Sequence, residues 1–217
     1  MQVKKGTNNI NDVGPFHGHY NMWLVFLSFA IAMVSAYVSF SFAIQLRFQS
    51  KQGEQIWLLS GSCALGIGIW SMHFVRMLAH SLPINMHYHI GYIIVSILFA
   101  TGGCYLALTY IHYGKNPLFT LLFATFFMGS GIVLMHYIGM SAMASVIVSY
   151  TSSKVLFSIC IAFIASFITL RVAFYTNYKL TWKVKLMCAA FMAIAITGMH
   201  YMGMNAAHFY PKNWIQR

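Results

Sequence analysis

One short motif occurs three times in this chain, each time at the end of a long apolar stretch. The copies are MHFVRML at 72–78, MHYIGMS at 135–141 and MHYMGMN at 199–205. Their histidines, His73, His136 and His200, are 63 and 64 residues apart. A fixed period of this length is the signature of a repeated structural unit. The chain is therefore predicted to contain three copies of one unit, each presenting a histidine at the same place.

The composition places these units in a membrane. Hydrophobic residues make up 59% of the chain and charged residues 7%, whereas soluble domains carry roughly 25% charged residues. Six segments reach the roughly 20 residues that a bilayer-spanning helix needs. We predict spans at 22–46, 57–79, 90–111, 118–143, 155–176 and 184–207. The predicted fold is all-α, one polytopic membrane domain at 22–207 between a polar tail at 1–21 and a short tail at 208–217.

The spans without the motif also repeat, which defines the unit. Ser28, Ser96 and Ser158 are each followed nine residues later by an aromatic residue. We therefore expect three helical hairpins that pack as a pseudo-threefold bundle around an axis along the membrane normal. Small residues precede each motif and would permit close helix approach. They are Gly66 and Gly68, Gly129 and Gly131, and Ala193 and Ala195.

The loop charges predict an orientation. The first, third and fifth loops carry most of the basic residues: Arg47, Lys51, Lys115, Arg171, Lys179, Lys183 and Lys185. The second loop has none and the fourth has only Lys154. Basic loops face the cytoplasm, so both termini and the motif ends of the spans are predicted to lie outside.

The scarcity of acidic residues excludes several functions. The only side-chain carboxylates belong to Asp12 and Glu54, both outside the apolar segments. Paired-carboxylate catalysis, di-iron carboxylate sites and carboxylate proton relays are thereby excluded, and no phosphate-binding loop is present, so we predict no enzyme. The net charge of +11 comes mostly from loop lysines and arginines, which fits lipid headgroups rather than nucleic acid.

Each motif offers metal-binding side chains on one helix face. A methionine follows each histidine by four residues, as in the pair His136 and Met140, and positions i and i+4 share a helix face. Imidazole together with thioether favours copper, especially Cu(I). A single buried histidine is commonly hydrogen-bonded to a neighbour, and methionine commonly fills core gaps. Three copies at one depth instead favour a shared site.

The motifs WSMHF, LMHYIGM and GMHYMGM resemble the signature of the MHYT domain, an integral membrane sensor domain of bacteria, over about Asn21 to Ala207. The resemblance implies a multi-pass sensor in the cytoplasmic membrane that binds copper near the outer face. It also implies that the copper senses a diatomic gas such as oxygen, carbon monoxide or nitric oxide. The implied ligands are Met72, His73 and Met77; Met135, His136, Tyr137 and Met140; and Met199, His200, Tyr201 and Met204.

The family resemblance also implies a seventh helix and a cytoplasmic output domain, such as a diguanylate cyclase, a phosphodiesterase or a histidine kinase. Only ten residues follow Ala207 here. We therefore expect either a sensor that signals through a partner or a piece of a longer protein.

The first motif departs from the family pattern. Arg76 stands where the other copies have Gly139 and Gly203, and Phe74 replaces the tyrosine. We expect Arg76 to extend to the outer lipid headgroups, because a guanidinium pointing inward would repel a cation. Phe74 has no hydroxyl and cannot be a ligand.

Two other function classes remain open. Facing histidines in a membrane can ligate haem, which would make the protein an electron carrier. A repeated-hairpin bundle is also compatible with a metal-ion transporter, although the absence of carboxylates in the spans argues against coupling to protons or sodium.

Overall fold

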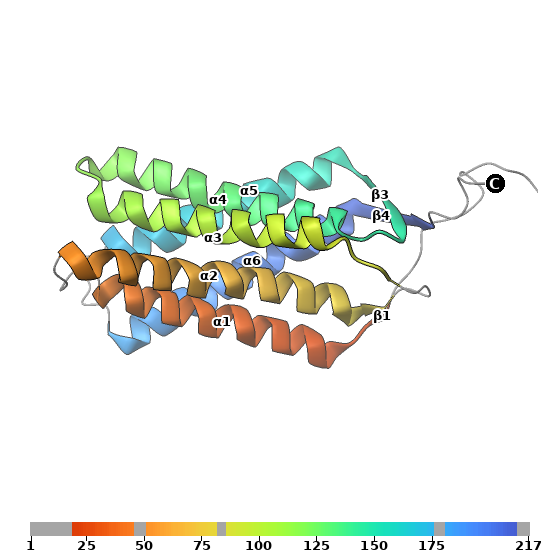
Figure 1. Cartoon of the computed structure of the whole chain (residues 1–217), viewed down its shortest axis with the longest axis horizontal. Helices are drawn as coiled ribbons and strands as arrows, with labels where there is room; N and C mark the ends of the chain where they lie inside the picture. Colours follow the sequence, from red (N-terminus) through yellow and green to blue (C-terminus); the bar gives the residue numbers. More distant parts are fainter. Residues whose placement is uncertain (1–18, 46–50, 82–85, 176–180, 212–217) are drawn as a thin grey trace, which may run out of the picture.

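The computed structural model describes residues 19–45, 51–81, 86–175 and 181–211. Six long helices run side by side, and two short antiparallel strand pairs lie at one end of them (Figure 1). The helices are α1 Met22–Gln45, α2 Lys51–Ala79, α3 Ile90–Tyr113, α4 Pro117–Ser141, α5 Ser152–Tyr175 and α6 Trp182–Ala206. Strand β1 His19–Tyr20 pairs with β2 His80–Ser81, and β3 Val146–Tyr150 pairs with β4 Ala207–Pro211.

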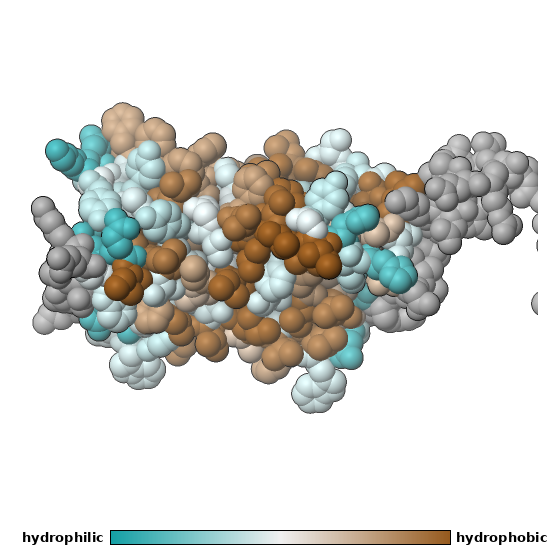
Figure 2. All heavy atoms as spheres, viewed as in Figure 1, coloured by the Kyte–Doolittle hydropathy of each residue, from teal (hydrophilic) through white to brown (hydrophobic). Residues whose placement is uncertain are grey.

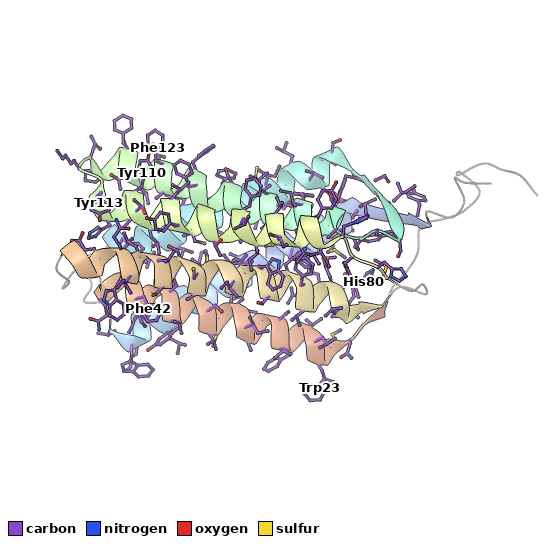
Figure 3. The ribbon with its side chains drawn as sticks, in the orientation of Figure 1. Trp23, Phe42, His80, Tyr110, Tyr113 and Phe123 are labelled. Carbon is purple, nitrogen blue, oxygen red and sulfur yellow. The ribbon has the colours of Figure 1, made fainter. Side chains whose placement is uncertain are left out.

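All six described helices are long and apolar enough to cross a bilayer, which confirms the predicted multi-pass membrane protein. Apolar residues cover the middle of the face shown in Figure 2, and hydrophilic residues gather toward the two ends. Trp23 points away from the bundle near the strand end (Figure 3) and is 84% exposed. This is the placement expected of a tryptophan at a membrane interface.

The helix boundaries differ from the predicted spans by a few residues at most ends. The largest difference is at α2, which begins at Lys51 rather than at residue 57. Its first turn contains Glu54, whose negative charge interacts favourably with the positive end of the helix dipole and stabilises the start of α2. Helix α4 begins where the side chain of Asn116 accepts hydrogen bonds from the amides of Leu118 and Phe119, a standard N-cap ahead of a proline.

The helices pack as three hairpins arranged in a closed ring. Helices α1 and α2, α3 and α4, and α5 and α6 form the hairpins, while α2–α3, α4–α5 and α1–α6 contacts join one hairpin to the next. Helix α4 also contacts α2 and α6, and side chains of α2 and α6 meet at His73 and His200. The buried shares of the α2, α4 and α6 spans are 50%, 50% and 44%. The corresponding shares of α1, α3 and α5 are 28%, 22% and 33%. The motif helices therefore form the inner ring, which confirms the predicted bundle of three hairpins.

Small residues allow the two helices of a hairpin to approach closely, as predicted. A Cβ added to Gly103 would lie 2.7 Å from the Phe127 carbonyl oxygen and 2.8 Å from the Gly131 Cα. A Cβ on Gly68 would overlap the Ser35 side chain. The close α3–α4 and α1–α2 contacts therefore require glycine, which has no Cβ, at these two positions.

The serine repeat is also present at the level of single hydrogen bonds. Ser28, Ser96 and Ser158 are fully buried. Each hydroxyl donates to the carbonyl three residues earlier, at 2.7 Å in all three cases. The three hairpins thus share one local geometry as well as one sequence pattern.

The helix ends fall into two groups at opposite ends of the bundle. The last turns of α1, α3 and α5 and the first turns of α2, α4 and α6 lie at one end, and the strands and the motif ends of α2, α4 and α6 lie at the other (Figure 1). Arg47, Lys179 and most of the two predicted tails lie outside the described residues. Which end faces the cytoplasm stays a prediction from the basic loops.

Candidate metal centre

The inner helices bring the three motif histidines together. His73, His136 and His200 are fully buried. The Nδ1 atom of His73 lies 3.1 Å from that of His200 and 3.2 Å from that of His136. One nitrogen from each ring lies within 4.8 Å of the other two, a grouping that could hold a metal ion. Three residues spread over 127 positions of the chain thus form one compact nitrogen cluster.

Hydrogen bonding alone does not satisfy this cluster well. Each neutral imidazole nitrogen offers either one hydrogen or one lone pair. The His73 Nδ1 atom approaches two nitrogens, and one hydrogen or one lone pair cannot fully satisfy both. A cation could instead accept a lone pair from each ring. Nitrogens about 2.0 Å from a metal would be ~3.3 to 3.5 Å apart, close to the spacing of these rings.

The glycine of the motif makes room for the histidine of the neighbouring helix. A Cβ on Gly139 would lie 2.5 Å from His73 Nε2, and a Cβ on Gly203 would lie 2.2 Å from His136 Nε2. Real Cβ atoms essentially never approach this closely. Gly139, three residues after His136, therefore accommodates the His73 ring, and Gly203, three residues after His200, accommodates the His136 ring. The sequence indicates this relation by placing glycine there in two of the three copies.

Six motif methionines flank the histidines along the inner helices. All are at most 7% exposed. Met72, Met135 and Met199 belong to the large apolar core of the bundle. Met77, Met140 and Met204 belong to a second cluster at the strand end, together with Phe209 and Val146. Four helical residues correspond to about 6 Å of rise, so this second cluster lies one turn beyond the histidines.

The two motif tyrosines contact outer parts of the bundle. The Tyr137 hydroxyl is 2.7 Å from the Ser158 hydroxyl on α5. The Tyr201 ring lies against the Arg76 guanidinium, 4.4 Å from its carbon to the ring centroid, and meets Tyr20 of β1 edge-on at 5.9 Å. Tyr137 therefore links α4 to α5. The metal-ligand role of the motif histidines, methionines and tyrosines stays a prediction.

The expectation that Arg76 reaches the lipid headgroups is wrong. Its side chain is 1% exposed, and its Nε donates to the Ser28 hydroxyl at 3.1 Å. A longer contact of 3.4 Å joins Nη2 to the Val25 carbonyl. The serine hydroxyl and the face of the Tyr201 ring hold the guanidinium inside the bundle. These partners come from α1 and α6, so the first motif alone could not reveal them.

His80 follows the first motif at the strand end of α2 (Figure 3). Its half-buried ring lies 4.7 Å from the Tyr20 ring and 5.9 Å from the Phe209 ring, between centroids. Burial lowers the pKa of His80 below its ordinary value of 6.5. This imidazole thus belongs to an aromatic layer above the methionine cluster.

Comparison with protein families identifies the repeat. The family model named MHYT, described as a bacterial signalling protein N-terminal repeat, matches residues 66–124 and 129–184. The two matched segments begin 63 residues apart, which is the period of the first two histidines. No solved structure is significantly similar.

The similar curated proteins are larger signalling proteins. The bifunctional diguanylate cyclase/cyclic di-GMP phosphodiesterase MucR of Pseudomonas aeruginosa is 38% identical over 193 residues, which cover 88% of this chain and 28% of MucR. The signalling protein YkoW of Bacillus subtilis is 34% identical over 200 residues, or 89% of this chain and 25% of YkoW. The cyclic di-GMP phosphodiesterase NbdA of P. aeruginosa is 32% identical over 191 residues, or 86% and 24%.

The chain therefore spans about a quarter of the length of these relatives. The match lies in the six-helix membrane region, and no catalytic activity follows from it for this chain. On the matched repeats and the shared motif, this chain belongs to the MHYT family of membrane-embedded signalling domains.

Proposed function

We propose that this protein is a membrane sensor that binds copper at His73, His136 and His200. The observation that carries the proposal is the approach of their Nδ1 atoms to 3.1 and 3.2 Å in a fully buried site. Burying three imidazoles together is costly, because each loses its hydration in the membrane. A bound ion would offset that cost.

The donor set favours Cu(I). The site offers neutral imidazoles with thioethers one turn away, and soft neutral donors select Cu(I) over harder cations. Glu54 is the one carboxylate in the described part of the chain, and it lies in the first turn of α2, far from His73 in the last turns. Met77, Met140 and Met204 share a helix face with the histidines and would add thioethers to the nitrogens. Tyr137 would join this ligand set only by giving up its bond to Ser158, and Tyr201 only by leaving Arg76.

The spacing of the nitrogens argues against haem at this place. Two axial haem ligands sit on opposite faces of the iron, so their nitrogens are about 4 Å apart with a porphyrin between them. The Nδ1 atom of His73 is closer than that to the Nδ1 atoms of both His200 and His136. A small ion fits the cluster better than a haem group.

When bound, copper would supply a centre that can change oxidation state or take up a diatomic gas such as oxygen, carbon monoxide or nitric oxide. The histidines would pass a change of their spacing to α2, α4 and α6. At the opposite end of α2, Glu54 accepts a hydrogen bond from Tyr113 of α3 at 3.1 Å and lies 3.5 Å from His112. A shift of α2 would therefore reach the basic loops, where a signalling partner or an output domain like those of the relatives would respond.

The test is the metal content of protein purified in detergent without oxygen. The variant His73→Ala/His136→Ala/His200→Ala should lose the copper that wild-type protein retains, expected at about one ion per chain. The matched control is His87→Ala/His89→Ala, which removes two exposed histidines. Equal copper in the wild type and the triple variant would reject the proposal, and a Soret absorption band would point to haem instead.

A further inference from the structure

Arg76 occupies the third of three equivalent positions around the histidine cluster. Gly139 of α4 adjoins His73, and Gly203 of α6 adjoins His136. The same step around the ring leads from α2 to His200, and the residue at that position of α2 is Arg76. The first copy thus has a positively charged arginine at the position where the other two copies have glycine.

The charge of Arg76 has no opposite charge near it in the described residues. Arginine stays protonated in proteins. The side-chain contacts of Arg76 are the Ser28 hydroxyl, the Val25 carbonyl and the Tyr201 ring, which are all neutral. Its Nη1 is buried without a hydrogen-bond partner there. Glu54 is 22 helical residues away, about 33 Å along α2.

This charge lies near the cluster. The guanidinium carbon is 4.4 Å from the Tyr201 ring centroid, and that ring is 6.1 Å from the His200 ring. Because Arg76 and His200 are both buried in the bundle, salt and bulk water screen the interaction between the guanidinium and an ion at the cluster only weakly.

We infer that Arg76 determines which cation the cluster accepts, by repelling a divalent ion more strongly than a monovalent one. The inference rests on the proposed metal site and adds the class of ion to it. Three neutral imidazoles without the thioethers suit divalent ions such as Zn²⁺ and Cu²⁺ as well as Cu⁺. The fixed guanidinium disfavours each added unit of charge, so the site prefers the monovalent ion.

The expected size follows from the distance. The guanidinium and the His200 ring both lie beside the Tyr201 ring, so they are at most about 10 Å apart. At that separation and an effective dielectric constant of ~20, one unit charge changes the affinity of a neighbouring unit charge by about tenfold. Removal of the Arg76 charge should therefore raise Cu⁺ affinity about tenfold and Zn²⁺ affinity about a hundredfold. The ratio of the two affinities should shift about tenfold toward zinc.

The experiment measures Cu⁺ and Zn²⁺ affinities of the full chain in detergent by competition with a chromogenic chelator, without oxygen. Arg76→Gln and Arg76→Gly remove the charge, and the second restores the residue of the other two copies. Arg76→Lys keeps the charge and should keep the wild-type ratio. Either neutral variant suffices if the other fails to fold.

A shift toward zinc in the neutral variants, absent in Arg76→Lys, supports the inference. Binding of both ions with an unchanged ratio overturns it alone, as would happen if an anion neutralised the guanidinium. Equal shifts in the neutral variants and Arg76→Lys also overturn it, because the effect would then be steric. Binding of neither ion by wild-type protein overturns the proposed function and this inference with it.

Discussion

The motifs of α2 and α4 hold their histidines and methionines alike but differ at two positions beside the histidine. On α4, Gly139 leaves room for His73, and Tyr137 bonds to Ser158. On α2, the corresponding residues are Arg76 and Phe74, which bring a buried charge and remove a hydroxyl. The comparison teaches that the bundle requires the histidine position, because three rings must meet there, while the residues beside it can change the charge of the site.

The strongest test of this comparison asks whether α6 tolerates a side chain where α2 carries one. Gly203→Ala would place a Cβ 2.2 Å from His136 Nε2, so the ring must turn and its Nδ1 must leave the cluster. We expect metal affinity to fall roughly 10- to 100-fold, the size of effect seen when the support of a metal ligand is lost. The measurement is chelator competition in detergent.

Gly198→Ala is the matched control on the same helix, because nothing lies within 4 Å of its Cβ position. Normal affinity in Gly203→Ala would show that the glycine is not required by the ring. A side chain at this position, such as that of Arg76, would then be compatible with metal binding in every copy.

A second test concerns the close contact inside the hairpin that ends in the α4 motif. Gly103→Ala should destabilise the protein by about 2 kcal/mol, because the added Cβ meets the backbone of α4 at Phe127 and Gly131. Its neighbour Gly102 faces open space, so Gly102→Ala should be neutral or slightly stabilising. Thermal unfolding in detergent separates the two. Equal stability of the two variants would contradict the close approach of α3 to α4.

A third test concerns the tyrosine position of the motif. Tyr137 of α4 bonds to Ser158 of the following helix, whereas Phe74 at the same position of α2 has no hydroxyl to offer the equivalent Ser96. Ser158→Ala removes the partner of Tyr137, whereas Ser96 hydrogen-bonds only to the Ile93 carbonyl in the described part of the chain. We expect Ser158→Ala to cost about 1 kcal/mol more than Ser96→Ala, the net value of one hydrogen bond. A double-mutant cycle with Tyr137→Phe should show that the difference disappears when the tyrosine hydroxyl is absent. A persistent difference would assign the cost to Ser158 alone.

The smallest effect concerns His80, which also belongs to the first copy only, since Met143 and Ala207 stand at the corresponding positions. Burial lowers the pKa of His80 in the folded protein below 6.5. Below pH 6.5 the unfolded chain binds a proton that the folded protein resists, so folding stability falls as the pH decreases. His80→Gln should remove this part of the pH dependence.

Unfolding of wild-type and His80→Gln protein at pH 7.5 and pH 5.5 gives the measurement. The stability gap between the two proteins should shift in favour of the variant at the lower pH. A gap that is the same at both pH values would show that the Tyr20 and Phe209 rings leave the proton affinity of His80 unchanged.

Much of the architecture can be predicted from local sequence patterns. Long apolar segments are enough to predict six helices, because a bilayer requires about 20 apolar residues whatever the helix packs against. The 63-residue period is enough to predict three hairpins and to place His73, His136 and His200 on alternate helices. The strand pair β3–β4 was missed, although the run Val146, Ile147 and Val148 is rich in β-branched residues that favour strands.

Packing between distant segments supplied the rest. The turn of each imidazole, the need for Gly139 and Gly203, and the buried course of Arg76 all depend on atoms from helices far away in the chain. Spacing along one helix tells which side chains share a face, but a long side chain or a ring takes its direction from what the neighbouring helices offer. For Arg76 these are a serine hydroxyl of α1 and a tyrosine ring of α6, both inside the bundle.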